Sequence, residues 1–491
     1  MSENKKIIEK QYYAFKLRLA SPLNVSAGLS EETDADVLRN GDGEVFIPGT
    51  SVAGAFRDAL MLKEKSDGIM GYSDGEQGRM SSILISDIYF MESEHVKTGI
   101  RDGIKLDDSK IVENKFDMEI VETGAVGTLY IECVVREGDT PEQYVDAIKK
   151  LVTMLQSGEI RFGANKNRGF GRVELLEEID KEESKDVTDT EEKTSKSIYV
   201  YSKRFADKDI DKYKDFILAC AYTNINSKGD DPKTSGKDIR LKQYDRQKLS
   251  DWIGEAWEKK CRNLNQHADA DQPLDLEQYV KISVPLRLMG GISIRRYSAK
   301  SNQADFEHIT CDGKPVIPGS SWNGAIRADV ARILRELIDA GKDKQMIVDN
   351  LIDGWFGKIS DEQGESMQSL VVVSESIIEG ATPVPMTRNK VNRFDASTVD
   401  GALYSEISYF GGKTTLELLI RKDEKRYYEE LVEILQLVIR DIKEGFVAVG
   451  GQTAVGRGVF APDGEQVDKT FGVPKLYELI CSKEAGKHDR I

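Results

Sequence analysis

The stretch Ile47-Pro-Gly-Thr-Ser-Val-Ala-Gly-Ala-Phe-Arg57 returns in the second half of the chain as Ile317-Pro-Gly-Ser-Ser-Trp-Asn-Gly-Ala-Ile-Arg327. Proline restrains the backbone before a helix and glycine permits an unusual turn, so each copy predicts a tight turn that opens a helix. Apolar residues follow at helical spacing in both copies (Val52, Phe56 and Ala59; Trp322, Ile326 and Val330). The recurrence predicts a duplicated unit.

Three further blocks recur in the same order. The stretch 70–87 (MGYSDGEQGRMSSILISD) is echoed by 356–374 (FGKISDEQGESMQSLVVVS), and the block that Arg101 opens is answered by one that Arg388 opens. A glycine-rich loop closes each copy, RFGANKNRGFGRVEL at 161–175 and AVGGQTAVGRGVFA at 448–461. Four blocks in register rarely arise by chance, so the chain is predicted to contain two copies of one domain.

Each copy is predicted to follow the order β-α-β-β-α-β, the ferredoxin-like and RRM-like arrangement of the α+β class. A strand of period two opens each copy, and the IPG helix follows it. Apolar runs and a second helix come next, at 83–88, 129–135 and 141–156 and again at 370–374, 415–420 and 424–443. The predicted domains are 1–177 and 279–491, and 178–278 is expected to be an acidic linker followed by a helical insertion.

The composition of the 491-residue chain predicts a cytoplasmic protein without a membrane partner. No run approaches the roughly 18 apolar residues that span a bilayer, the first residues lack the features of a signal peptide, and the five cysteines lack metal-ligand spacing. The net charge of −16, taken over the whole chain, argues against nucleic-acid binding. However, residues 176–193 hold nine acids against three lysines, so a basic site can exist elsewhere.

The shared blocks allow a structural and a functional interpretation. As structure, the IPG hydroxyls cap a helix, Arg57 and Arg327 are surface charges, and the glycine-rich loops are tight turns. As function, free N–H groups at a helix start bind phosphate and a nearby arginine supplies the matching charge. Glycines likewise let backbone N–H groups approach a polyanion. The duplication favours function, although neither loop has P-loop or dinucleotide spacing.

Acidic residues precede each IPG block, Asp34 and Asp36 in the first copy and Asp305 in the second. A carboxylate beside a phosphodiester can hold a divalent cation or position a 2′-hydroxyl. The alternative is an ordinary loop aspartate. Of the four histidines, only His308 lies near a shared block, and it has no counterpart in the first copy. A two-histidine ribonuclease site is therefore not evident.

The IPG-[TS]-S-x-x-G-x-x-R block, together with a GxGR-type loop near the end of each unit, resembles the RAMP superfamily of CRISPR–Cas systems. More narrowly, it resembles the backbone subunits of type III effectors in the tandem-fused form of type III-D systems. The resemblance covers 10–177 and 279–462. It implies a modified RRM-like core, a filament of subunits along a guide CRISPR RNA, and complementary target RNA paired with that guide in a prokaryotic cytoplasm.

The resemblance also implies partner subunits, a thumb hairpin in each half and a set of residues that contact RNA. The partners are the large polymerase-like subunit, other RAMP backbone subunits and the small subunit of the effector. A thumb hairpin that wedges between guide and target is implied at 101–124 and 388–409. Contacts to RNA are implied for the IPG helix, its arginine, the third block and the glycine-rich loop, here Ser51, Arg57, Arg101, Lys105, Asn165, Arg168, Arg172, Ser321, Arg327, Arg388, Gln452 and Arg457.

Relatives of this kind cut target RNA through an aspartate upstream of IPG, with a divalent metal required. The pattern maps that aspartate to Asp34, with Asp36 as the close alternative, and Mg²⁺ or Mn²⁺ is the implied cofactor. In the second copy, a gap-free alignment on IPG puts Asp305 opposite Ala35, so assigning Asp305 needs a one-residue slip. Asp34 and Asp305 are the expected metal ligands.

Three hypotheses remain open at this point. The first is a guide-binding backbone subunit that cleaves target RNA. The second is the same scaffold without nuclease activity in one or both halves. The third is a standalone enzyme that processes precursor guide RNA, which the absence of a histidine near either loop disfavours.

Overall fold

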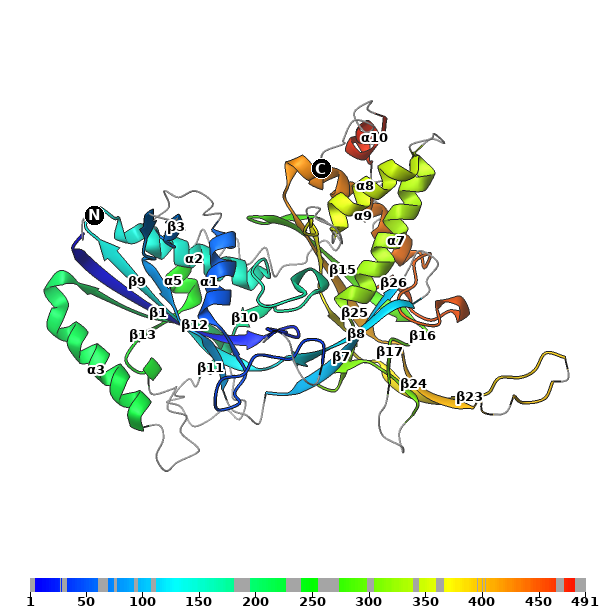
Figure 1. Ribbon diagram of the computed structural model, residues 1–491, viewed down its shortest axis with the longest axis horizontal. Helices are drawn as coiled ribbons and strands as arrows, with labels where there is room; N and C mark the ends of the chain where they lie inside the picture. The colour runs from blue at the N-terminus through cyan, green and yellow to red at the C-terminus, as the bar shows by residue number, and fades with distance from the viewer. Residues whose placement is uncertain are drawn as a thin grey trace, which may run out of the picture.

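The computed structural model describes residues 5–26, 28, 33–60, 69–74, 77–91, 96–106, 112–180, 195–226, 240–254, 273–297, 304–338, 344–358, 366–394, 396–399, 401, 403–464 and 472–481. Two α+β halves lie side by side, the first on the left of Figure 1 and the second on the right. The predicted fold class and the tandem arrangement are confirmed.

The first half has the predicted element order. Its central sheet runs β10-β1-β9-β5, with each neighbouring pair antiparallel. In chain order the elements are β1 (Ile7–Leu19), α1 (Gly49–Ala59), β5 (Ile83–Ile85), β9 (Val126–Arg136), α2 (Pro141–Ser157) and β10 (Val173–Leu175). Short strands β2 (Phe46–Ile47), β3 (Tyr72–Asp74), β4 (Gln77–Arg79) and β6 (Ile88–Met91) lie around this sheet.

The second half repeats the order and the strand arrangement, as β26-β15-β25-β21. Its elements are β15 (Tyr279–Met289), α7 (Gly319–Leu337), β21 (Val371–Val373), β25 (Lys413–Arg421), α9 (Tyr428–Lys443) and β26 (Val459–Pro462). The predicted helix 424–443 begins as a 3₁₀ turn at 424–426. Helices α8 (Lys344–Phe356) and α10 (Pro474–Cys481) pack beside α7 and α9.

The cores explain the sequence periodicity. Tyr13, Phe15 and Leu17 point from β1 into the same core as Val52 and Phe56 of α1, all nearly inaccessible to water. Strand β15 and helix α7 contribute the corresponding residues to the second core. Each such side chain contributes roughly 1.5–3 kcal/mol when it leaves water.

The segment between the halves is partly an extension of the first sheet. Strand β12 (Ser195–Ala206) pairs antiparallel with β1, and β11 (Glu177–Asp180) and β13 (Asp245–Lys248) pair with β12. Helices α3 (Ile210–Asn226) and α5 (Leu249–Ile253) are present, and β14 (Leu274–Asp275) pairs with β15. The segment expected to be a helical insertion contains helix α3 and also strand β12, whose alternating Ile-Tyr-Val-Tyr run pairs with an open edge of β1.

A long hairpin projects from each half, at the places where thumb hairpins are predicted (Figure 1). The first joins β7 (Thr98–Leu106) to β8 (Val112–Val121), and the second joins β23 (Thr382–Arg388) to β24 (Tyr404–Phe410). The short strands β16 (Gly291–Ile292), β17 (Arg295–Tyr297) and β18 (Phe306–His308) belong to the sheet of the second hairpin, whereas β19 (Thr310–Cys311), β20 (Lys314–Ile317) and β22 (Ser376–Ile377) form a separate sheet. Among the residues described above, no helix is long and apolar enough to cross a membrane.

Candidate functional site

The two predicted catalytic aspartates lie at the bases of the two hairpins. Asp34 donates its backbone N–H to the Asp117 carboxylate at 3.0 Å, and the Asp117 N–H donates to the Asp34 carboxylate at 3.1 Å. Asp117 belongs to β8, so this reciprocal pair fastens the Asp34 loop to the second strand of its hairpin. One Asp34 oxygen, Oδ2, is used in this contact, and the side chain is exposed.

Asp305 makes the same reciprocal contact in the second half. Its backbone N–H donates to the Ser405 hydroxyl at 3.2 Å, while the Ser405 N–H donates to Asp305 Oδ2 at 2.7 Å. The Ser405 hydroxyl donates to the same oxygen at 3.0 Å. The Ser405 amide and hydroxyl hold the pKa of Asp305 below its ordinary value, because both bonds favour the ionised carboxylate.

This shared contact identifies Asp305 as the structural counterpart of Asp34. Each aspartate docks on the second strand of its own hairpin, β8 or β24, through one bond in each direction. The loop from the aspartate to the IPG isoleucine is one residue shorter in the second half, which explains the slip in the sequence alignment. Asp36 has a different position, since its carboxylate accepts from the Thr33 N–H and hydroxyl within its own turn.

A glutamate near the first docking contact holds the Asp34 loop in place. In the first half, Glu119 accepts from the Val37 N–H at 3.0 Å and from Arg39 at 2.9 Å, and its own N–H donates to the Ala35 carbonyl. The hydrogen bond from Arg39 holds the pKa of Glu119 below its ordinary value although burial opposes this. The Asp34 loop is thus fixed at both ends.

Glu406, which follows Ser405 in β24, has a fully buried carboxylate and makes different contacts. Arg388 and Arg295 approach it at 2.9 and 3.4 Å, and the Gln452 amide donates to it at 2.8 Å. Its strand also pairs in parallel with the residues that follow Asp305. Two predicted RNA-binding residues, Arg388 and Gln452, therefore meet within one network beside Asp305.

The glycine-rich loops of the two halves have one conformation. Asn165 and Gln452 both adopt φ near +55° and precede a 3₁₀ turn. Gly171 and Gly458 follow with φ of +74° and +69°, and a methyl group on either would overlap a backbone carbonyl oxygen of its own loop. Here glycine is a steric requirement, so the turn interpretation of the loops is correct as far as it goes.

The IPG blocks start helices α1 and α7, but their hydroxyls do not cap them. Pro48 and Pro318 occupy the N-cap positions, and neither helix has a side-chain cap at that position. The expected capping is therefore wrong, because proline takes the position that a serine or threonine cap requires. The Gly49 N–H instead donates to the Asp87 carboxylate at 2.7 Å. Ser51 and Ser321 lie in the first turns of the two helices.

The remaining predicted cations have several different environments. Arg57 donates to the carbonyl oxygens of Gly71 and Met70 at 2.8 and 2.6 Å. Arg327 lies 3.6 Å from Asp353. Arg457 stacks on the ring of Phe410 at 4.4 Å, next to the second hairpin. Arg168 is half-buried in the first glycine-rich loop, the Asn165 amide faces the Met118 sulfur, and the side chain of Lys105 lies outside the described residues.

Two arginines predicted to bind RNA contact the other half instead. Arg101, 6% exposed, forms a two-bond ion pair with Glu375 of the second half, at 2.5 and 3.2 Å. Arg172 lies 2.7 Å from Glu417 of the second half. A role in RNA binding stays a prediction for both residues, and the structure gives them a structural partner.

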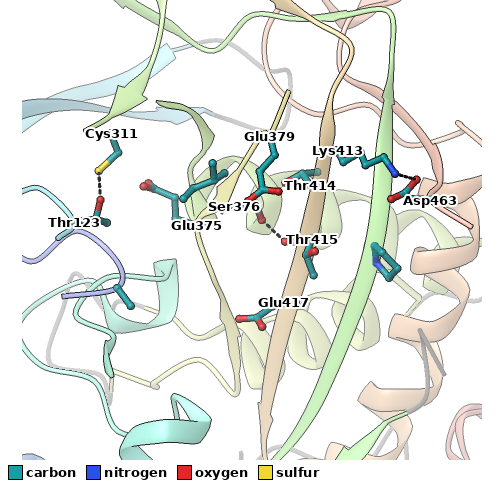
Figure 2. A pocket seen from close by; sticks show the side chains of 13 residues that line it. Thr123, Cys311, Glu375, Ser376, Glu379, Lys413, Thr414, Thr415, Glu417 and Asp463 are labelled. Atoms are coloured by element: carbon teal, nitrogen blue, oxygen red, sulfur yellow. Dashed lines mark hydrogen bonds and ion pairs between the residues drawn. The ribbon is translucent and has the colours of Figure 1, made fainter. Parts of the chain in front are cut away.

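A cavity of about 360 Å³ lies where the halves meet, shown in Figure 2. Its lining includes Glu375, Glu379, Glu417 and the Lys413–Asp463 ion pair. Lys413, the lysine of this lining, is already paired with Asp463, so the cavity offers little attraction to a phosphate backbone. The cavity is therefore a poor RNA site, and the hairpin bases remain the candidate site.

His308 is a core residue in this structure. It is 3% exposed, accepts from the Ile294 N–H at 2.9 Å through Nδ1, and lies 3.0 Å from the Val316 carbonyl oxygen through Nε2. Among the described residues it is the one histidine, and its ring faces no open surface. The structure thus gives His308 no position from which to act on RNA.

The residues that position the aspartates were not predicted from the sequence: Asp117, Glu119 and Ser405. They lie on the second hairpin strands, 83 and 100 residues from Asp34 and Asp305 in the two docking pairs. Only the register of the hairpins brings them together. Each second strand carries a glutamate, in DMEIV at 117–121 and SEISY at 405–409, but two residues after Asp117 and one residue after Ser405, so the sequence offered no shared signal.

A model of the RAMP superfamily matches residues 16–174 and 302–461, which together make up more than half of the chain. The chain therefore belongs to the RAMP superfamily. The two matched regions fall on the two halves of the structure, so the protein is a tandem RAMP protein, and RNA binding in a CRISPR system is the function that membership implies. No curated protein matches the chain.

Proposed function

We propose that this protein is a guide-RNA-binding backbone subunit of a type III CRISPR effector, of the III-D kind, and that it cleaves target RNA at Asp34 and Asp305. The observation that supports this most strongly is the repeated docking of one exposed aspartate at the base of each hairpin. A hairpin that separates guide from target would bring a distorted target strand to its base. The proposed partners are a guide RNA, a target RNA and the other effector subunits.

The donor groups beside the aspartates suit a divalent cation such as Mg²⁺ that shares its coordination with RNA and water. Mg²⁺ usually binds one or two carboxylates, several waters and substrate phosphates. Asp34 and Asp117 provide two neighbouring carboxylates, and Asp305 with the Ser405 hydroxyl provides one carboxylate and one neutral oxygen. Bound there, the cation would neutralise charge that develops on the scissile phosphate.

The proposed reaction is an in-line attack by the neighbouring 2′-hydroxyl of the target RNA. The 2′-oxygen bonds to phosphorus while the bond from phosphorus to the next 5′-oxygen breaks, and the hydroxyl proton is lost as the leaving oxygen gains one. Asp34 and Asp305 orient the 2′-hydroxyl, and the hairpin holds the nucleotides apart so that the angle is in line. The products are a 2′,3′-cyclic phosphate and a 5′-hydroxyl end.

The class of the protein is tested by purifying it with bound nucleic acid and sequencing that nucleic acid. The proposal expects RNA of uniform length that carries a CRISPR repeat-derived tag. Heterogeneous cellular RNA, or no RNA at all, would contradict it. The end chemistry of cut target RNA provides the second test, because a 3′-hydroxyl product would exclude attack by the 2′-hydroxyl.

The alternative is an RNA scaffold that does not cleave in one or both halves. The difference between the halves supports it for one site, since Asp34 has a second carboxylate beside it whereas Asp305 has a serine. Cleavage at one position only, lost with Asp34→Asn and kept with Asp305→Asn, would identify the second half as scaffold.

A further inference from the structure

Three arginines of the first half reach into the second half at the junction between them. Arg101 pairs with Glu375, Arg172 pairs with Glu417, and Arg161 donates to the Ser374 hydroxyl at 2.8 Å. Ser374 and Glu375 directly follow β21, and Glu417 belongs to β25 of the second half. The junction is therefore specified by charge-assisted hydrogen bonds in addition to shape.

Two of these contacts are shielded from water, whereas the Arg172–Glu417 side chains are 22% and 18% exposed. Arg161 is 4% exposed, and the side chains of Arg101 and Glu375 are 7% and 4% exposed. Glu417 divides its two oxygens between Arg172 at 2.7 Å and Lys281 of its own half at 3.1 Å. Burial opposes its ionisation, but Arg172 and Lys281 outweigh that effect and lower the pKa of Glu417 to about 2.

The backbones also approach closely at this junction. A methyl group on Gly169 would lie 2.6 Å from the Glu375 nitrogen, and one on Gly319 would meet the Arg168 carbonyl oxygen. The first glycine-rich loop therefore packs directly on the start of α7 and the end of β21. Because the backbones are in direct contact, the halves cannot slide past each other without separating. Such a separation would also break the ion pairs.

The second glycine-rich loop lacks the arginines that make this contact. The bonds Phe162 N–H to Gly171 O and Val449 N–H to Gly458 O are equivalent, each 2.9 Å long. By this correspondence, Ala448 of the second loop is the counterpart of Arg161, and Val459 is the counterpart of Arg172. A role common to both loops, such as holding RNA, therefore does not need arginine at these two positions.

We propose that Arg101, Arg161 and Arg172 are positioning residues that lock the two halves at one separation, and that they do not bind RNA. The lock would set the distance between the Asp34 and Asp305 loops through the protein itself. This consequence for the two cut positions depends on the proposed function, whereas the lock itself does not.

The first test measures the separation of the halves in the free protein. Spin labels on non-natural residues at the exposed positions Leu218 and Tyr477 report one distance across the junction. The wild type is expected to give one narrow distance distribution, and the double variant Glu375→Gln/Glu417→Gln a broad one. Asp463→Asn is the matched control, because it removes a carboxylate at the same cavity whose partner, Lys413, is in the same half. A narrow, unchanged distribution in the double variant would overturn the lock.

The second test separates a lock from RNA contacts. Exchanging the charges, Arg101→Glu with Glu375→Arg, keeps the pair but moves the cation to the other half. The lock predicts a narrow distance and an affinity for guide RNA within about twofold of wild type. A loss of about tenfold or more with the distance intact would show that Arg101 binds RNA and would overturn the proposal. A free protein that is locked but binds no RNA would contradict the proposed function alone.

Discussion

Replacing His308 with asparagine is expected to remove a pH dependence of stability that this one side chain creates. Burial lowers the pKa of His308 from the ordinary 6.5 to about 4, despite a compensating bond to the Val316 carbonyl. A proton on Nδ1 would also point at the Ile294 N–H and break that bond. Asparagine retains an acceptor near the Nδ1 position but does not ionise.

The sign follows from which state binds the proton. Between pH 6.5 and 4 the unfolded chain protonates His308 while the folded chain does not, so stability falls as the pH falls. The stability that depends on a neutral His308 is fully present above pH 6.5 and is lost by pH 4. The full loss is roughly 3 kcal/mol, of which roughly 2 kcal/mol is lost by pH 5.

The assay measures the urea unfolding of wild type and His308→Asn at a series of pH values from 7.5 to 5. Hydrogen exchange of amides in the second half monitors the unfolding. Other ionisable groups titrate in both proteins and cancel in the difference between them. The expected result is a less stable variant whose deficit shrinks by roughly 2 kcal/mol between pH 7.5 and 5. Two parallel pH profiles would refute the assignment of His308 as a neutral core residue.

Further substitutions test the loops and the hairpin bases. Gly458→Ala should cost about 3 kcal/mol or more in stability, because φ is +69° and the methyl overlaps the Val449 carbonyl. Gly456→Ala, which has a similar φ and open space around it, should cost only about 1 kcal/mol, and equal losses in the two would contradict the steric argument. Glu119→Gln should slow the first target cut by about tenfold or more and leave the second unchanged, as measured on end-labelled RNA, since only the Asp34 loop is loosened; equal slowing of both cuts would refute this. Arg57→Lys keeps the charge but gives up at least one of two carbonyl bonds, so thermal unfolding should show a loss of roughly 2 kcal/mol, whereas weaker RNA binding at unchanged stability would favour the predicted guide contact.

Features that repeat along the sequence were predictable because they depend on local chemistry. The IPG blocks, the alternating strands at 13–19 and 280–288 and the glycine-rich loops each indicate a turn, a strand or a helix without reference to distant residues. Two copies of the same order then identified the α+β fold. The strand at 195–206 was not predicted, although its Ile-Tyr-Val-Tyr run alternates, because the run does not identify the distant strand β1 with which it pairs.

The same limit explains the site. Asp34 and Asp305 could be proposed from their place before IPG, but the residues that hold them are on hairpin strands whose register is unknown from sequence. Arg101 looked like an RNA ligand because a lone arginine in a shared block carries no sign of a partner 274 residues away. An ion pair between two domains can be recognised only when the arrangement of the domains in space is known.

Mapping target cuts in the assembled complex tests whether each half carries a cutting aspartate at the base of its hairpin. Wild type, Asp34→Asn, Asp305→Asn and the double variant would be compared at equal guide and target binding. Two cut positions are expected in wild type, loss of a different one in each single variant, and none in the double variant. Undiminished cutting by the double variant, with the same 5′ ends, would contradict a cutting role for these aspartates.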